Sequence, residues 1–195
     1  MGATGLRETK KAQTRLALRD AAVDLFVANG YDATTVADIA AAAQVSEPTF
    51  YRYYPTKAAV VLAPLEHRID ASLTALEGLP LELAPLEACL RNVLGAEAAD
   101  LLPAPTEAPY LRELRSTQSL RSAMLDLFDA ATDRLALDFA ERLGQPPDVL
   151  EVRQTAAVVI VTLQEIFLQW ATDTDDFDVV PTAVAAFERL RGGLR

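Results

Sequence analysis

Short polar and aromatic side chains occupy one stretch of the chain at a spacing that suits contact with nucleic acid. The stretch of eight residues contains Ser46, Glu47, Pro48, Thr49, Tyr51, Arg52 and Tyr53. On a helix, these groups would offer hydroxyls, a carboxylate and phenol rings to the base edges and phosphates of a DNA major groove. A generic helix hairpin can carry the same residues, so the pattern by itself leaves both interpretations open.

The residues that usually carry catalysis or bind metals are scarce. The chain of 195 residues has one histidine, His67, and one cysteine, Cys89, which lie 22 positions apart, and it has no glycine-rich phosphate loop. A nucleophile–base pair therefore has little support, and a zinc site would lack ligands. None of the 28 acidic residues is singled out by its surroundings. We expect a protein that is not an enzyme and has no metal or cofactor.

The elements that must position the polar stretch all have helical patterns. An apolar repeat that begins at Leu18 predicts a first helix, which Asn29–Gly30 ends. Thr35–Asp38 has the pattern of a capping box at the start of a short second helix. Ser46 is the expected N-cap of a third helix, with Pro48 in its first turn. Two short helices joined by a few residues have the layout of a helix-turn-helix.

The rest of the chain also reads as helix. Further helices are expected over residues 57–76, 86–99, 110–116, 120–143, 148–172 (opened by an Asp148–Glu151 capping box) and 180–190. Breaks that contain proline or glycine separate most of them, and no strand pattern or internal repeat occurs. The predicted fold class is all-α, with an N-terminal three-helix helix-turn-helix domain and a larger helical domain.

Charge is divided unevenly along the chain. Residues 1–60 contain seven basic and six acidic side chains, whereas residues 61–195 contain 11 basic and 22 acidic ones. Five of the seven N-terminal cations precede Asp20 and form a basic arm that leads into the first helix. Such an arm can contact phosphates, and an acidic remainder would be repelled from DNA. Many helical proteins have one end that is more basic, so charge alone does not decide the matter.

Several features that the sequence lacks indicate the cellular compartment of the protein. One cysteine excludes an internal disulfide, and residues 1–16 lack the apolar stretch of a signal peptide. The most apolar run, Ala156–Leu163, is too short to span a bilayer. We therefore expect a soluble, cytoplasmic protein.

Two motifs in the first third of the chain carry a family resemblance. They read Leu25-Phe26-x-x-x-Gly30-Tyr31-x-x-Thr34-Thr35-x-x-x-Ile39-Ala40-x-x-Ala43 and Val45-Ser46-x-x-Thr49-Phe50-Tyr51-Arg52-Tyr53-Tyr54-Pro55-Thr56-Lys57. Together they closely resemble the DNA-binding domain of the TetR family of bacterial one-component regulators, over residues 10–62. The resemblance implies a helix-turn-helix domain of residues 1–56, whose basic arm is residues 1–15, and a ligand-binding and dimerisation domain of residues 57–195.

The resemblance also implies roles for individual residues. Those that would contact DNA are Thr35, Ser46, Glu47, Pro48, Thr49, Tyr51, Arg52, Tyr53 and Lys57. Thr35 would donate to a phosphate, assisted by the dipole of the second helix. Glu47 could accept from a cytosine amine, and Pro48 could pack on a thymine methyl. The remaining polar side chains would contact the groove or phosphates, and Arg52 could equally stay solvated.

Two positions depart from the family pattern. Gln44 stands where the family usually has glycine in the turn, and a left-handed conformation would cost a residue with a Cβ about 1 kcal/mol or more. We therefore expect a slightly altered turn. Ala37 offers no base contact at a position of the second helix where some relatives make one. Specificity would therefore depend more on the third helix.

The family's last two helices pair with their twofold mates, which implies a homodimer through residues 149–171 and 180–191. One apolar stripe comprises Val152, Ala156, Val159 and Leu163, and another comprises Val180, Val184 and Phe187. The same residues could belong to the core of a single chain. The sequence does not divide them between the two uses.

A ligand pocket is expected among the helices between residues 57 and 171. Its candidate residues are His67, Cys89, Tyr110, Arg121, Met124, Phe128, Thr162, Phe167 and Trp170, although apolar residues at helical spacing are core by default. The C-terminal half is diffusely similar to regulators like the mycofactocin-system repressor, which respond to long-chain acyl-CoA. An acyl-CoA-like molecule is therefore one candidate effector.

These patterns predict a dimeric, sequence-specific transcriptional regulator. The expected mechanism is that of a repressor released from a palindromic operator by a small, largely apolar ligand. The alternatives are a regulator that needs a corepressor and a DNA-binding protein without a ligand. A fully filled core would favour the protein without a ligand, and a cavity of some hundreds of Å³ would favour a ligand-responsive one.

Overall fold

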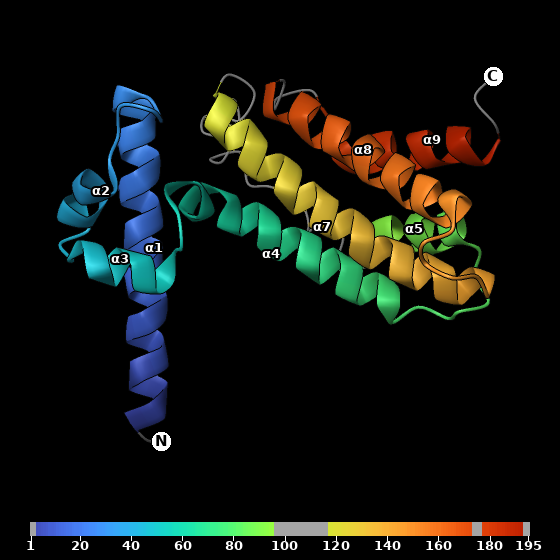
Figure 1. The fold of residues 1–195 in the computed structure, drawn as a ribbon, viewed down its shortest axis with the longest axis horizontal. Helices are drawn as coiled ribbons and strands as arrows, with labels where there is room; N and C mark the ends of the chain where they lie inside the picture. Colours follow the sequence, from blue (N-terminus) through green and yellow to red (C-terminus); the bar gives the residue numbers. More distant parts are fainter. Residues whose placement is uncertain (1–2, 96–116, 173–176, 193–195) are drawn as a thin grey trace. The chain divides into compact units, whose positions relative to one another are not determined.

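The computed structural model describes residues 3–95, 117–172 and 177–192 (Figure 1). This part of the chain is helical and contains no strand, which confirms the predicted all-α fold. In chain order its helices are α1 (Ala3–Asn29), α2 (Val36–Ala42), α3 (Glu47–Tyr53), α4 (Lys57–Glu77), α5 (Pro85–Leu94), α7 (Gln118–Leu143), α8 (Leu150–Thr172) and α9 (Val179–Arg191). None of these helices is long and apolar enough to cross a membrane.

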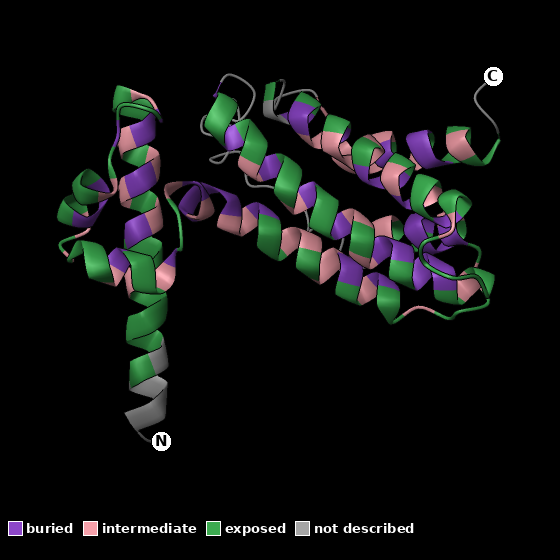
Figure 2. Cartoon of the chain, viewed as in Figure 1, coloured by how far each residue is buried: buried purple, intermediate pink, exposed green. Residues whose placement is uncertain are grey.

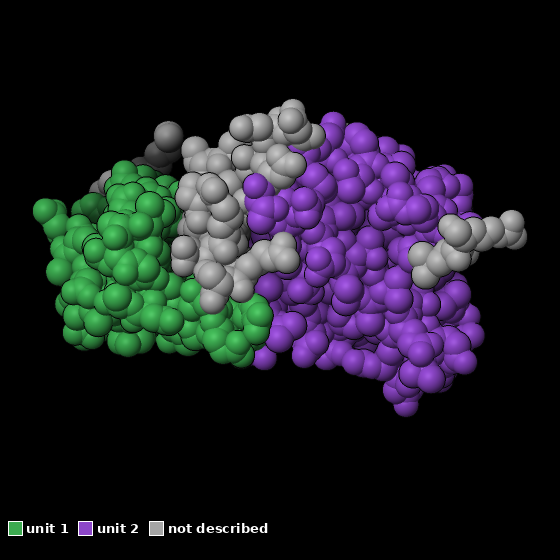
Figure 3. All heavy atoms as spheres, turned by 90° about the horizontal axis from the view of Figure 1, so that it is seen from above, with its two compact units in different colours: residues 1–64, 113–123 green, residues 65–112, 124–195 purple. Residues whose placement is uncertain are grey.

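The chain folds as two compact units, which Figure 3 shows in separate colours. The first unit comprises residues 1–64 and 113–123, and the second comprises residues 65–112 and 124–195. Both α4 and α7 therefore contribute residues to each unit. The division of α4 falls at Pro64, which lies inside the helix, where proline removes a backbone N–H from the hydrogen-bond ladder.

Local signals build the helices of the first unit. Gly30 ends α1 in a left-handed conformation with φ of 84°, and its N–H donates to the Phe26 carbonyl at 2.9 Å. Thr35–Asp38 forms the predicted capping box at the start of α2, and the Ser46 side chain caps α3. The predicted end of α1 and the predicted starts of α2 and α3 are therefore confirmed. The start of α1 is corrected, because the helix begins at Ala3 rather than near Leu18, so residues 3–15 of the expected basic arm are part of the helix.

A small apolar core fixes the arrangement of these three helices. α1 packs on α2, and α2 packs on α3. Leu18, Phe26, Ile39 and Phe50 are each at most 2% exposed (Figure 2). Full burial of such side chains stabilises a fold by roughly 1.5–3 kcal/mol each. The core therefore makes a rigid platform for α3.

The second unit is a bundle of longer helices. α9 packs against both α5 and α8. The core of this unit contains Leu135, Phe139, Val152, Val159 and Phe187, each at most 2% exposed. The buried positions recur along one side of each helix, as an amphipathic helix requires (Figure 2). This core brings together residues that are distant in the sequence.

An enclosed ion pair fastens the end of α4 to α7. Arg142 Nε lies 2.6 Å from Asp138 Oδ2, and the two side chains are 0% and 5% exposed. The same guanidinium donates to the carbonyls of Leu76 and Pro80 at 2.9 and 2.7 Å. These contacts satisfy a charge that would otherwise be costly to bury.

Some expectations are corrected or fall outside the description. α8 begins at Leu150, and the Arg153 N–H donates to the Val149 carbonyl at 3.1 Å. Val149 rather than Asp148 therefore occupies the N-cap, and the capping box expected at Asp148–Glu151 is wrong. The expected helix of residues 110–116 lies outside the described residues, as do residues 96–99, which were expected to end α5.

Candidate DNA-binding surface and ligand pocket

The start of α3 is shaped by hydrogen bonds between close neighbours. Ser46 Oγ accepts from the Thr49 N–H at 3.3 Å, and the hydroxyls of these two residues lie 3.0 Å apart. Pro48 occupies the first turn, where its missing N–H is not needed, and Glu47 places a negative charge near the positive end of the helix dipole. Ser46 and Thr49 are therefore engaged with each other, whereas Glu47 and Pro48 are exposed.

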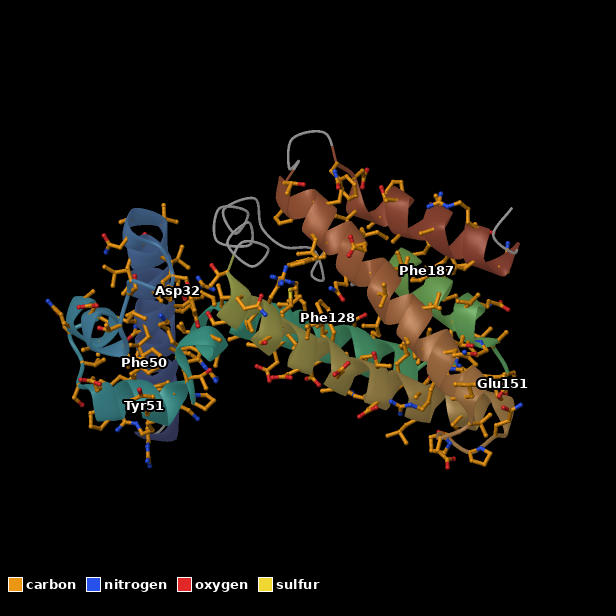
Figure 4. All side chains as sticks on the ribbon, turned by 45° about the horizontal axis from the view of Figure 1, so that its top comes forward. Asp32, Phe50, Tyr51, Phe128, Glu151 and Phe187 are labelled. Atoms are coloured by element: carbon orange, nitrogen blue, oxygen red, sulfur yellow. The ribbon has the colours of Figure 1, made fainter. Side chains whose placement is uncertain are left out.

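α3 has one buried face and one exposed face (Figure 4). Phe50 is completely buried, and Tyr54, one turn later, is 3% exposed. Tyr51 is 52% exposed, and its neighbour Arg52 is also exposed. The Arg52 guanidinium carbon lies 5.3 Å from the centroid of the half-buried Tyr53 ring. The exposed face thus presents a carboxylate, a proline ring, a phenol and a guanidinium.

The turn before α3 keeps a left-handed conformation at Gln44, so the altered turn expected from the missing glycine does not occur and the residue carries the strain instead. Its φ is 56°, and it is the one residue other than glycine with a positive φ among the described residues. The Gln44 N–H donates to the Ala41 carbonyl at 3.0 Å, and the Val45 N–H donates to the Ala40 carbonyl at 2.8 Å. These bonds satisfy the last carbonyls of α2 and hold the turn in a conformation that glycine would adopt more cheaply.

Thr35 already has a partner for its hydroxyl. Its Oγ1 and its backbone N–H both donate to Asp38 Oδ2, at 2.6 and 2.9 Å, and the Asp38 N–H donates back to Oγ1 at 3.1 Å. These hydrogen bonds hold the pKa of the Asp38 carboxyl below its usual value. A phosphate at this position would have to draw the Thr35 hydroxyl away from a carboxylate.

Lys57 lies at the start of α4 and is bound to the turn between α1 and α2. Its Nζ donates to the carbonyls of Tyr31 at 2.7 Å and Thr34 at 2.8 Å, and it lies 4.1 Å from the centroid of the Tyr31 ring. Partial burial lowers the pKa of this amine. Two of the three N–H groups of Lys57 Nζ therefore donate to backbone carbonyls and stabilise the fold. The sequence pattern had not indicated this role.

The start of α7 contacts the same turn. Ser119 Oγ donates to Asp32 Oδ1 at 3.2 Å. Thr117 and Leu120 are buried beside it, 8% and 2% exposed. These residues belong to the first unit although they are distant from it in the sequence. The α1–α2 turn is therefore held both by Lys57 of α4 and by Ser119 of α7.

The second unit contains a partly open cavity of about 160 Å³. Most of its lining is apolar and comes from α4, α5, α7, α8 and α9. Of the residues proposed from the sequence, Cys89, Phe128 and Phe167 line it. Burial raises the pKa of the Cys89 thiol to about 12, so the thiol stays protonated at neutral pH and acts as an apolar wall.

Other residues proposed from the sequence do not line this cavity. His67 and Arg121 are exposed, and the Arg121 guanidinium donates to Gln118 Oε1 at 2.8 Å. Thr162 donates its hydroxyl to the Val158 carbonyl at 2.7 Å. Met124 and Trp170 are buried elsewhere, 2% and 6% exposed. Tyr110 lies outside the described residues.

Three polar side chains in the cavity wall were missed from the sequence. Arg68 and Ser72 lie one turn apart on α4, and Asn92 lies on α5. Asn92 Nδ2 donates to the Ser72 carbonyl at 3.1 Å and to Ser72 Oγ at 2.8 Å. The spacing of Leu65, Arg68 and Ser72 on a helix was the available signal, because residues three and four apart share a face.

The apolar stripes proposed for a dimer are largely used within the chain. Val152, Ala156 and Phe187 are 0% exposed, and Val159 is 2% exposed. The apolar residues that α8 leaves exposed are instead Leu150 at 64%, Val158 at 45% and Val161 at 54%. The structure thus separates core residues of α8 from exposed ones, a division that the sequence had left open.

These features define a class of protein. A short helix pair with an exposed, polar second helix, joined to a larger helical unit with a cavity, is the architecture of a helix-turn-helix transcriptional regulator. Residues 18–63 match the family model described as bacterial regulatory proteins of the tetR family.

Comparison with known proteins gives the family. The chain is 33% identical to the HTH-type transcriptional regulator TcmR of Streptomyces glaucescens, over 98% of this chain and 87% of that protein. It is 30% identical to the HTH-type transcriptional repressor LfrR of Mycolicibacterium smegmatis, over 75% and 76% of the two chains. Thermus thermophilus FadR, a TetR-family repressor solved in complex with lauroyl-CoA, superposes with a TM-score of 0.51, 26% identity and coverage of 93% and 95%. This chain therefore belongs to the TetR family of DNA-binding transcriptional regulators, which are not enzymes.

Proposed function

We propose that this TetR-family regulator is a homodimeric repressor that a small, largely apolar ligand releases from a palindromic operator. The observation that carries the proposal is the division of α3 into a fully buried face at Phe50 and an exposed face at Glu47, Tyr51 and Arg52. A helix held this firmly can present its outer side chains to the major groove with little loss of conformational freedom. The cavity in the second unit supplies the place for a ligand.

The exposed face of α3 divides between base and phosphate contacts. Glu47 accepts from a cytosine amine, and Pro48 packs on a thymine methyl. Tyr51, Arg52 and Tyr53 contact phosphates, which set the register of the helix on the duplex. The hydroxyls of Thr35, Ser46 and Thr49 are hydrogen-bonded within the capping motifs. These residues therefore contribute to DNA binding by fixing the N-terminal ends of α2 and α3.

Lys57 takes a different role in this proposal. Its amine donates to two backbone carbonyls, so we assign it to holding the α1–α2 turn rather than to a phosphate. Its position also matters for signalling, since α4 begins at Lys57 and continues into the cavity wall at Leu65 and Arg68. One continuous helix thus links the ligand site to the turn that supports the DNA-binding helices.

A homodimer follows from the requirements of recognition. One α3 helix contacts only a few base pairs, and two helices that read half-sites about 34–36 Å apart multiply affinity and specificity. The exposed apolar residues Leu150, Val158 and Val161 of α8 suit the pairing of helices 150–172 and 179–191 between two chains. Ligand binding changes the separation of the two α3 helices and thereby lowers operator affinity, by no more than the ligand's differential affinity for the two states.

The operator test uses the purified chain and sheared genomic DNA from its own organism. Fragments retained at near-physiological salt are sequenced, and we expect a shared palindrome. Tyr51→Ala should then weaken binding to that palindrome about tenfold or more, because a phosphate contact is lost. Val27→Ala is the matched control, since Val27 is 60% exposed on α1 and is given no role at DNA. Unchanged affinity of the Tyr51 variant would contradict the assigned recognition helix.

The effector test adds candidate ligands to the protein–operator complex. Lauroyl-CoA, the molecule bound to the Thermus relative, tests the acyl-CoA-like class directly. Release of the operator supports a repressor that its ligand removes from DNA. Tighter operator binding would instead identify a corepressor, because the ligand would then favour the state that fits DNA.

A further inference from the structure

The cavity in the second unit has one polar edge in an otherwise apolar wall. Arg68 and Ser72 form this edge on α4, and Asn92 of α5 joins it through its hydrogen bonds to Ser72. Phe128, Phe167 and other apolar side chains form the rest. A wall of this kind fixes the orientation of a ligand, because polar groups of the ligand have partners on one side alone.

Arg68 supplies a positive charge at this edge. Its guanidinium carbon lies 5.9 Å from the centroid of the Phe167 ring, and both residues are half-buried in the cavity wall. A guanidinium has five N–H donors in a planar fork, so it can bind a carboxylate as well as other partners. The apolar surroundings strengthen such a pairing, because the effective dielectric constant is lower than in water.

The second polar group is the Asn92 side chain, whose Oδ1 atom can accept a hydrogen bond. Within the residues that the structure describes, Asn92 donates two hydrogen bonds from its Nδ2 atom, and its Oδ1 atom makes none. The side chain is half-buried in the cavity wall. A hydroxyl or N–H of a ligand can therefore donate to this oxygen, on the same polar edge as Arg68.

The dimensions limit the apolar part of the ligand. The cavity volume is about 160 Å³, and a cavity of about 150 Å³ lined by Leu, Ile and Phe binds benzene. Phe128 of α7 and Phe187 of α9, both labelled in Figure 4, and Phe167 of α8 contribute aromatic walls. A single ring with short substituents fills this space, whereas a longer ligand would extend out through its open side.

We infer that the effector is a small carboxylic acid with a ring-sized apolar body, whose carboxylate pairs with Arg68. The inference rests on the proposed function, because it concerns the same cavity. The body lies among the three phenylalanines, and a hydroxyl on the same side of the ring as the carboxylate donates to Asn92. Arg68 thus selects acids over neutral molecules of the same shape.

The test compares two probes that differ only in charge, 4-ethylbenzoate and 4-ethylbenzamide. Isothermal titration of the full chain without DNA should show the acid binding about tenfold more tightly than the amide. Arg68→Met should abolish this preference through loss of acid binding, and Arg68→Lys should retain part of it because the charge remains. Arg91→Met is the matched control, since the Arg91 side chain on α5 is 57% exposed and does not line the cavity.

Each result decides the inference. Equal binding of acid and amide by the unaltered chain overturns it, as does the absence of binding by both probes or a preference that persists in Arg68→Met. A separate operator-release assay tests the proposed function. If an acid binds through Arg68 but does not release the operator, the proposed release by a ligand is contradicted and the role of Arg68 stands. If the acid and the amide release the operator at equal concentrations, the selection of acids is contradicted and release by a ligand stands.

Discussion

The hydrogen bonds that form the helix ends of the first unit and those that join helices within the second unit differ in the sequence separation of their partners. In the first unit, the bonds that start and end helices join residues three to five positions apart, as between Thr35 and Asp38 or Val45 and Ala40. In the second unit, the polar contacts that join helices span 20 to 66 positions, as between Asn92 and Ser72 or Arg142 and Leu76. Local bonds give a small unit its helix ends, whereas distant ones decide which helices enclose a cavity.

The largest predicted effect sharpens this comparison in the second unit. Arg142→Met leaves Asp138 enclosed without its cation and leaves the carbonyls of Leu76 and Pro80 without donors. We expect a loss of about 3–5 kcal/mol in the free energy of unfolding, measured with urea. Arg153→Met is the control, because the Arg153–Asp133 pair is 49% and 64% exposed and should contribute under about 1 kcal/mol. Similar losses for both variants would refute the special role of the enclosed pair.

The next prediction concerns a long-range contact in the first unit. Lys57→Met removes the donors to the Tyr31 and Thr34 carbonyls, and we expect a loss of about 2 kcal/mol in stability. Its effect on the salt dependence of operator binding separates a tether from a phosphate contact. Arg52→Met should reduce the slope of log affinity against log salt by about 0.9, and Lys57→Met should leave it unchanged. A reduced slope for Lys57→Met would show that the amine contacts phosphate.

A smaller effect is expected in the turn between α2 and α3. Gln44→Gly should stabilise the protein by about 1 kcal/mol, because glycine adopts the observed φ of 56° without a steric penalty. Ala41→Gly, on the exposed side of α2, should destabilise it by about 1 kcal/mol. Thermal unfolding of both variants checks the opposite signs, and a destabilised Gln44→Gly would argue against strain in the turn.

The smallest effect depends on pH. The pKa of Asp38 is lowered in the folded state by its hydrogen bonds to Thr35, so its carboxylate stabilises the fold above the unfolded pKa. That contribution is lost as the pH falls through the lowered folded pKa. The stability difference between the unaltered chain and Asp38→Asn should therefore be constant near neutral pH and shrink in acid. A difference that does not change down to about pH 3 would contradict this assignment.

The cavity shows why its residues were harder to predict than the DNA-binding surface. The structure places Cys89, Phe128 and Phe167 in the cavity wall, and the other candidates lie elsewhere or outside the described residues. Arg68 was missed because an arginine on an amphipathic helix is usually solvated. Its position in a cavity depends on how α4 packs against α5 and α8, and no short motif encodes that packing.

The sequence by itself determined the end of α1, the starts of α2 and α3, and the family. Capping, glycine stops and left-handed turns depend on residues within one or two helical turns, so spacing is enough to find them. Only the tertiary structure decided that Lys57 holds the α1–α2 turn, that Val152 and Val159 belong to the core, and that Arg68 faces the cavity. Each of these outcomes depends on which distant helix packs on which face, because burial is decided by contacts that span the whole chain.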